Sequence, residues 1–205
     1  MNNPWKEVPL DVYEGHMTLD TVAQLQALDS LYEERLAAYP KSSVAFWGVA
    51  GGNGLRHIDP ARDVAVYGVD INGAYLDACR NRYPGLAGKL MLIAADLSRP
   101  VKLPYAELIF ADLLIEYIGI PTFIARVQAC KPRILCCTVQ RNLAETFVSP
   151  SPYADAFAGV GSLHTDVEEG LLTKSLDTIG YALLYRDEIP LVNGKQFLRL
   201  DYTAR

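Results

Sequence analysis

The sequence contains no long apolar segment and no excess of basic charge. Its most apolar stretch, Leu103 to Ile118, is interrupted by Glu107, Asp112 and Glu116, whereas a bilayer span needs about 18 apolar residues. The first residues lack the basic-then-apolar pattern of a secretion signal. The 19 basic and 24 acidic residues give a net charge of −5, which argues against a phosphate backbone as the main partner. We therefore expect no membrane and no nucleic-acid partner, which leaves small molecules or other proteins.

Cysteine and histidine are also scarce. The four cysteines form no Cys-x-x-Cys motif, and the three histidines share no metal-ligand spacing, so the sequence predicts no metal site. Cys136 and Cys137 are adjacent in a predicted buried strand, and a redox pair is the less favoured interpretation of them. Because unpaired buried thiols are typical of a reducing compartment, we expect the protein to be cytoplasmic.

The chain has 205 residues, half of them apolar, which is the size of one domain with a single core. We expect residues 42–205 to form this domain and residues 1–41 to form an arm and helix packed on or over its cleft. Apolar residues at helical spacing predict a helix over Leu19–Tyr39, which Pro40 ends. The aromatic-rich stretch from Trp5 to Met17 shows no period.

From residue 44 onward, short apolar runs alternate with helical stretches. Near-continuous apolar runs are typical of strands in a parallel sheet that is covered on both faces. The predicted strands are Val44–Val49, Val64–Asp70, Leu90–Ala94, Ala106–Leu113 and Arg133–Val139, and the predicted helices are Gly54–Ile58, Asn72–Tyr83 and Pro121–Ala129. This alternation predicts an open α/β sheet with right-handed crossovers.

The C-terminal part of the chain predicts an antiparallel addition to that sheet. Thr165 to Glu168 form a capping pattern that opens an amphipathic helix reaching Ile179. Two strand-like runs follow, Tyr181–Leu191 and Lys195–Tyr202, joined by an Asn-Gly turn that is a strong hairpin signal. The sequence thus predicts a Rossmann-like α/β fold. It would be an open, doubly wound, mostly parallel seven-stranded sheet with an antiparallel C-terminal hairpin strand, preceded by an N-terminal helical arm.

A glycine-rich turn, Gly48 to Gly54, follows the first predicted strand and opens the next helix, so backbone N–H groups can approach a ligand closely. It matches neither a Walker loop nor Gly-x-Gly-x-x-Gly. Asp70, Asp96 and Asp112 follow or end the next three strands. Carboxylates there line the crevice in which open α/β sheets bind ligands, and one of them can accept both ribose hydroxyls. Taken singly, a tight turn or a turn-starting aspartate also explains each feature.

Together these motifs resemble those of the class I S-adenosylmethionine-dependent methyltransferases, over residues 42 to 202. The resemblance implies S-adenosylmethionine as cofactor and S-adenosylhomocysteine as product, held by residues 42–205 as the cofactor-binding domain. It assigns to the cofactor Gly48, Ala50, Gly52 and Gly54 of the turn, Asp70 for the ribose hydroxyls, Ile71 beneath the adenine, and Asp96 with Leu97 at the adenine edge.

Two residues depart from the pattern of that family. Ala50 stands in the place of the first glycine, and Gly48 stands where most members carry an acidic residue that contacts the methionine amino end. The segment from Phe110 to Tyr117 resembles the one that borders the methyl-transfer site. The arm resembles a leader found in some small bacterial members.

Methyl transfer from a sulfonium is an in-line displacement with a neutral leaving group, so the protein mainly aligns and desolvates the reactants. A hydroxyl or ammonium acceptor also needs a base. The candidate catalytic residues are His16, which titrates near neutral pH, Asp112 at a strand end, and Tyr13 in the arm. Structural roles stay open for each of them, since His16 can pack in the arm and Asp112 can bind backbone amides.

The acceptor class follows by exclusion. Asp112 is not followed by the Pro-Pro-aromatic turn of base methylases, and no basic patch is evident, so we expect a small-molecule acceptor. Residues 141–164 are long for a connection, and we expect them to border the acceptor pocket. Two other hypotheses stay open: a module that binds a nucleoside-type ligand or a partner without catalysis, and a nucleotide-dependent oxidoreductase, which the glycine pattern and the hairpin disfavour.

Overall fold

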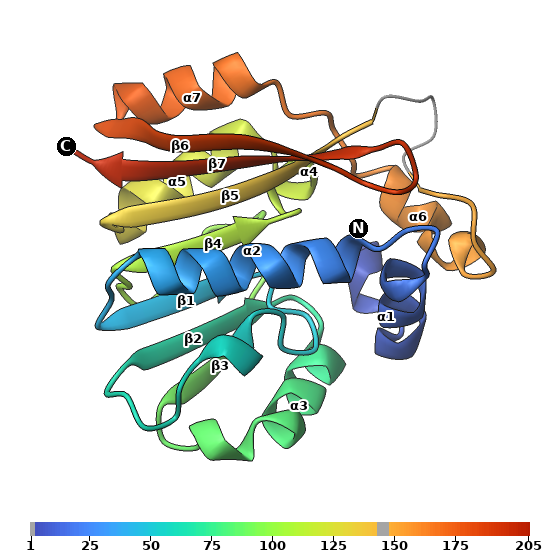
Figure 1. The fold of residues 1–205 in the computed structure, drawn as a ribbon, viewed down its shortest axis with the longest axis horizontal. Helices are drawn as coiled ribbons and strands as arrows, with labels where there is room; N and C mark the ends of the chain where they lie inside the picture. The colour runs from blue at the N-terminus through green and yellow to red at the C-terminus, as the bar shows by residue number, and fades with distance from the viewer. Residues whose placement is uncertain (1–2, 143–147) are drawn as a thin grey trace.

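Parallel strands form the centre of the sheet, and a C-terminal hairpin extends one edge (Figure 1). The computed structural model describes residues 3–142 and 148–205. In these residues the strand order is β3-β2-β1-β4-β5-β7-β6, and β7 runs antiparallel to both neighbours. The strands are β1 Ser43–Trp47, β2 Ala65–Asp70, β3 Leu90–Ala94, β4 Leu108–Asp112, β5 Ile134–Arg141, β6 Tyr181–Pro190 and β7 Gln196–Ala204. The predicted mostly parallel seven-stranded sheet with an antiparallel hairpin strand is confirmed.

Helices cover both faces of the sheet, as near-continuous apolar strands require. Phe46 of β1 points to the face under α2 and α3, while Trp47 points to the face under α5 and α7. The helices are α1 Leu10–Thr18, α2 Gln24–Ala38, α3 Gly73–Arg82, α4 Ile115–Ile118, α5 Ile120–Cys130, α6 Ala158–Gly161 and α7 Glu169–Thr178, with 3-10 turns η1 Pro4–Lys6, η2 Leu55–His57, η3 Pro84–Leu86 and η4 Ala154–Phe157. Among the described residues, no helix is both long and apolar enough to cross a membrane.

The N-terminal arm differs from its prediction. The single helix expected over Leu19–Tyr39 is wrong at its start, because α1 ends at Thr18 and α2 begins only at Gln24, after Ala23 in the left-handed region (φ 50°). Val22 is fully buried in the linker between them. Its apolar side chain extends the helical spacing of apolar residues into a segment that is not helical, and this is why the predicted helix began too early. The helix α1 itself was missed because it buries the adjacent residues His16 and Met17 and so shows no apolar stripe.

Two helix starts were also predicted incorrectly. The glycine turn is followed by the three-residue turn η2 rather than by a helix over Gly54–Ile58. At the C-terminal side, Thr165 does not cap α7: its N–H and its hydroxyl both donate to the Glu116 carbonyl, at 2.8 and 3.0 Å. The cap is Glu168, whose carboxylate accepts from the amides of Gly170 and Leu171. A tertiary contact has thus displaced the local capping pattern.

A buried ion pair fixes α2 to the centre of the sheet. The side chain of Arg35 is 0% exposed; its Nη1 lies 3.0 Å from Asp112 Oδ1 at the end of β4, and its Nε lies 2.8 Å from Asp201 Oδ1 on β7. Nη1 also donates to Thr138 Oγ1 and Nη2 to the Cys137 carbonyl. Burial alone would lower the pKa of Arg35, but the adjacent carboxylates raise it above its ordinary value, so the guanidinium stays charged.

Packing beneath the glycine turn explains two of its glycines. Gly52 has φ +116°, and a Cβ there would lie 2.2 Å from the Tyr83 ring. Gly54 has φ +80°, and its Cβ would lie 2.6 Å from the Phe46 ring. Ala50 also has a positive φ of 48°, a conformation that costs L residues about 1 kcal/mol or more. The turn is therefore held in shape by the aromatic side chains under it.

We expect Arg35→Met to lower the free energy of unfolding by about 3–5 kcal/mol, because it leaves the buried Asp112 carboxylate without its cation and leaves Asp201 with Arg199 alone. The matched control is Glu34→Gln on the same helix, whose side chain is 63% exposed in its pair with Arg199 and contributes about 1 kcal/mol or less. Urea unfolding measures both variants. A loss below about 1 kcal/mol for Arg35→Met would contradict the anchoring role.

We expect Gly52→Ala to destabilise the protein by about 2–4 kcal/mol, because the new methyl group meets Tyr83 and the backbone angle is unfavourable. Gly73→Ala is the control, since a Cβ at Gly73 has nothing within 4 Å. Thermal unfolding compares the two variants. Equal melting temperatures would show that the turn does not need its glycine.

Candidate functional site

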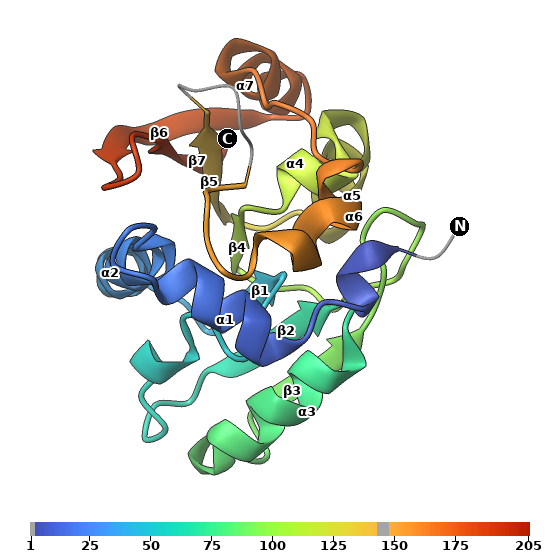
Figure 2. The same cartoon turned by 90° about the vertical axis from the view of Figure 1, so that its right-hand side faces the viewer.

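A cavity lies at the carboxyl ends of the parallel strands. The ribbon shows α1 and α6 crossing this edge of the sheet (Figures 1 and 2). The lining of the cavity comes from the arm, the strand ends and the segment after β5. The lining residues include Trp5, Tyr13, His16, Gln24, Gly48, Ala50, Asn53, Asp70, Ile71, Tyr75, Asp96, Leu97, Asp112, Leu114, Glu116, Tyr117, Gln140, Val148, Ser149, Phe157 and Lys195. This is the crevice in which open α/β sheets bind their ligands.

The Asp70 carboxylate lies directly beside the glycine turn. Its Oδ2 accepts from the Ala50 N–H at 2.9 Å, and its Oδ1 accepts from the Asn72 N–H at 2.9 Å. Burial raises the pKa of Asp70 above its usual range, and the amides of Asn72, Ala50 and Ile71 oppose that shift. Each oxygen keeps a further acceptor site. The side chain can therefore accept two more hydrogen bonds from a ligand in the cavity.

The residues expected at the adenine edge occupy one end of the cavity. Ile71, Asp96 and Leu97 all line it. Asp96 Oδ1 accepts from the N–H of Ser98 at 3.0 Å, and its Oδ2 lies 3.4 Å from Arg99 Nε. This end thus offers a carboxylate beside apolar walls.

The turn residues divide into two groups. Gly48 and Ala50 line the cavity, and a Cβ at Gly48 would meet only the Leu114 side chain, 4.0 Å away. Gly52 and Gly54 are not among the lining residues; they face the aromatic rings beneath the turn. Asn53, which the sequence analysis did not select, lines the cavity between them and donates to the Tyr13 hydroxyl at 3.2 Å.

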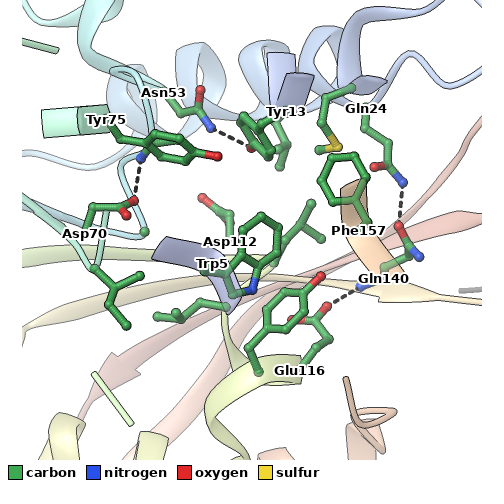
Figure 3. A pocket seen from close by; sticks show the side chains of 18 of the residues that line it. Trp5, Tyr13, Gln24, Asn53, Asp70, Tyr75, Asp112, Glu116, Gln140 and Phe157 are labelled. Carbon is green, nitrogen blue, oxygen red and sulfur yellow. Dashed lines mark hydrogen bonds between the residues drawn. The ribbon is translucent and has the colours of Figure 1, made fainter. Parts of the chain in front are cut away.

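The arm covers the cavity with aromatic side chains (Figure 3). The Trp5 ring lies edge-on to those of Tyr117 and Phe157, with centroids 5.1 and 6.2 Å apart. Asn72 Nδ2 fastens the arm to the sheet by donating to the carbonyls of Trp5 and Val8, at 3.0 and 3.2 Å. The cavity at the strand ends is therefore covered by residues that are far from those strands in the sequence.

The three candidate catalytic residues, Tyr13, His16 and Asp112, all line the cavity. Burial raises the pKa of Tyr13 to about 12, so its hydroxyl is neutral at physiological pH. Burial and Lys195 lower the pKa of His16, and its Nδ1 lies 2.7 Å from Ser151 Oγ. Asp112 is held in the ion pair with Arg35. Burial raises the pKa of Asp112 above its usual range, and the Arg35 guanidinium opposes that shift. In this arrangement Tyr13 and His16 are neutral hydrogen-bonding groups, and Asp112 is tied to Arg35.

Other cavity residues were not selected from the sequence. Gln24 on α2 donates from its amide to the Gln140 amide oxygen on β5. Glu116 lies in the first turn of the short helix α4, and its side chain is buried. A charge inside an otherwise apolar stretch was an available signal for Glu116. Arg35 and Gln24 carried no such signal, because polar residues on a helix usually face solvent. Among the described residues, no group of three His, Cys, Asp or Glu side chains could hold a metal ion.

No protein-family model and no curated protein match the sequence. Solved structures do match the fold. A magnesium protoporphyrin IX methyltransferase from Synechocystis PCC 6803, solved with bound S-adenosylmethionine, has a TM-score of 0.66 at 13% identity, over 98% of this chain and 90% of that one. A cyclopropane synthase from Mycobacterium tuberculosis has a TM-score of 0.65 at 12% identity, over 89% of this chain and 84% of that one.

A 4+2 cyclase is similar to the same degree, with a TM-score of 0.66 at 12% identity, over 89% of this chain and 82% of that one. At such identities the likeness concerns the fold alone, because one fold carries several chemistries. The strand order, the antiparallel hairpin and these neighbours agree with the resemblance noted in the sequence. The chain has the class I S-adenosylmethionine-dependent methyltransferase-like fold.

Proposed function

We propose that this chain binds S-adenosylmethionine in the cavity and transfers its methyl group to a small-molecule acceptor. The observation that carries the proposal is the Asp70 carboxylate beside the Ala50 amide, both lining one cavity. A carboxylate at this strand end is suited to the two hydroxyls of a ribose. The solved neighbour with bound S-adenosylmethionine supports the choice of ligand.

The residues present fit such a cofactor. Asp70 would accept from the ribose hydroxyls, Ile71 would lie beneath the adenine, and Asp96 with Leu97 would contact its edge. The open space over Gly48, where a Cβ would meet only one side chain, leaves room for the methionine end. The backbone of Gly48 and Ala50 would border that end. Gly52 and Gly54 would act indirectly, by shaping the turn.

When bound, the cofactor supplies a methyl group on a positively charged sulfur, which is an intrinsically reactive donor. The chain's own part is to exclude water and to hold the acceptor in line. The aromatic cover from Trp5, Tyr117 and Phe157 serves the first task. Tyr13 and His16 would donate or accept hydrogen bonds to orient the acceptor. Asp112 would be kept in position beside the acceptor by its ion pair with Arg35. Residues Val148, Ser149 and Phe157 support the expectation that the segment 141–164 borders the acceptor.

The structure favours this ligand over a dinucleotide. Dinucleotide-binding sheets place the pyrophosphate at the N-terminus of a helix that follows the glycine turn. Here the turn is followed by the three-residue η2, which offers no such helix end. A binding module without catalysis would use the same pocket. It differs from an enzyme only in turnover, so detection of methyl transfer separates the two.

We expect Asp70→Asn to weaken binding of S-adenosylhomocysteine by about 1–3 kcal/mol. The change replaces one of the two oxygens that would accept from the ribose hydroxyls and removes the negative charge of the side chain. Isothermal titration measures the dissociation constant. Asp77→Asn is the matched control, since it removes the same charge from the exposed surface of α3, where Asp77 is 72% exposed.

An unchanged affinity in Asp70→Asn would show that the ribose lies elsewhere. If the wild-type protein produced no heat with S-adenosylmethionine or S-adenosylhomocysteine at high micromolar concentration, the cofactor assignment and the enzymatic function would both be contradicted.

A further inference from the structure

Two carboxylates that line the cavity, those of Asp112 and Glu116, each have one oxygen with no hydrogen-bond partner among the described residues. Asp112 is paired with Arg35 through its other oxygen. Glu116 is 2% exposed and lines the cavity from the short helix α4, just beyond the end of β4. Its Oε1 accepts from the Gln140 N–H at 2.7 Å, as Figure 3 shows, whereas its Oε2 has no hydrogen-bond partner among the residues that the structure describes. A buried acceptor left without a donor costs stability. Because this unpartnered oxygen belongs to a residue that lines a ligand cavity, it indicates that the ligand carries a hydrogen-bond donor for it.

The position of Glu116 is fixed by contacts from three elements. Gln140 on β5 holds one carboxylate oxygen, and Gln24 on α2 in turn donates to the Gln140 amide. Thr165, ahead of α7, donates twice to the Glu116 backbone carbonyl. The side chain is therefore preorganised before any ligand binds, as a residue that meets a reacting atom needs to be.

Aromatic rings flank this end of the cavity. Tyr117 follows Glu116 directly in the chain, and the Trp5 ring packs edge-on against the Tyr117 ring. The Phe157 ring packs against Trp5, and its centroid lies 5.0 Å from that of the His16 ring. Such walls suit a flat, apolar ligand with one donor group aimed at the carboxylate. A ring that carries a hydroxyl group meets both requirements.

The electrostatic environment brings the pKa of Glu116 close to neutral pH, so the protonated and ionised forms are similarly populated there. Burial raises the pKa of Glu116 to about 7, the Gln140 amide opposes that shift, and the carboxylates of Asp112 and Asp166 add to it. The other titratable groups that line this end are Tyr117, His16 and Lys195. General bases work best when their pKa lies near the operating pH.

We propose that Glu116 Oε2 binds the hydroxyl group of a ring-bearing acceptor and takes its proton as the methyl group is transferred. The inference rests on the proposed function. In the step, the acceptor oxygen forms a bond to the methyl carbon, and the carbon–sulfur bond breaks with its electron pair left on the neutral thioether. The hydroxyl proton moves to Glu116, which later releases it to solvent.

Phenol and its methyl ether, anisole, test this role because they differ only in the donor hydrogen. Each is titrated calorimetrically into protein saturated with S-adenosylhomocysteine, using the wild type, Glu116→Gln and the control Glu33→Gln. Glu33 lies on the exposed side of α2. Binding of S-adenosylhomocysteine by each variant is measured first and shows that it is folded.

At about pH 8.5, where Glu116 is ionised and phenol is still neutral, we expect phenol to bind at least about tenfold tighter than anisole to the wild type and Glu33→Gln. At about pH 5.5 Glu116 is protonated and can itself donate to either oxygen, so the preference should disappear. It should be absent at both pH values in Glu116→Gln, whose amide donates to either compound.

With S-adenosylmethionine, anisole formation from phenol should rise with pH around a midpoint of about 7 and fall at least about 100-fold in Glu116→Gln. Any of four outcomes overturns the role of Glu116. They are equal affinities for phenol and anisole at the higher pH, a preference that survives Glu116→Gln, no phenol binding up to about 10 mM, or binding without anisole formation. If the wild type fails to bind S-adenosylhomocysteine, the proposed function itself is contradicted as well.

Discussion

The contact of Arg35 with Asp112 and Asp201 is the constraint on which the architecture of the site depends. A guanidinium with no exposed surface lies between carboxylates from β4 and β7, and removing Arg35 would leave the buried Asp112 carboxylate without a cation. The pair fixes α2 across the sheet, and α2 leads back through a short linker to α1. This buried interaction thus fixes the helix from which the arm extends and holds Asp112 at the base of the cavity, while Asn72 fastens the start of the arm.

The two halves of the cavity differ in the kind of contact that positions their residues. The half near the glycine turn presents backbone and the Asp70 carboxylate, whose geometry is determined by short local hydrogen bonds. The half near Glu116 is assembled from α2, β5, the arm and the segment before α7, through side chains that meet only in the folded state. The features proposed to hold a nucleoside are local, whereas those proposed to bind an acceptor are built by tertiary contacts.

This difference explains what could be predicted from the sequence. The sheet, its hairpin and the position of Asp70 depend on local periodicity, turn chemistry and strand ends, and they were predicted correctly. The break between α1 and α2 was not, because Val22 is buried in a linker and imitates a helical stripe. The contact that takes Thr165 away from the cap of α7 and the roles of Arg35, Gln24 and Glu116 depend on partners about 24 to 166 residues away in the chain, which a local pattern cannot reveal. Gly52 and Gly54 were selected for a ligand, but Tyr83 and Phe46 require them.

The central claim is that the glycine turn and Asp70 hold one nucleoside beneath the arm. A crystal structure of the protein grown with S-adenosylhomocysteine tests it most directly. The account predicts ligand density in the cavity, with both ribose hydroxyls within hydrogen-bond distance of the Asp70 carboxylate, Ile71 beneath the adenine, and Asp96 and Leu97 at the adenine edge. Density for the nucleoside at another surface, or a cavity closed by the arm with the ligand absent at saturating concentration, would contradict it.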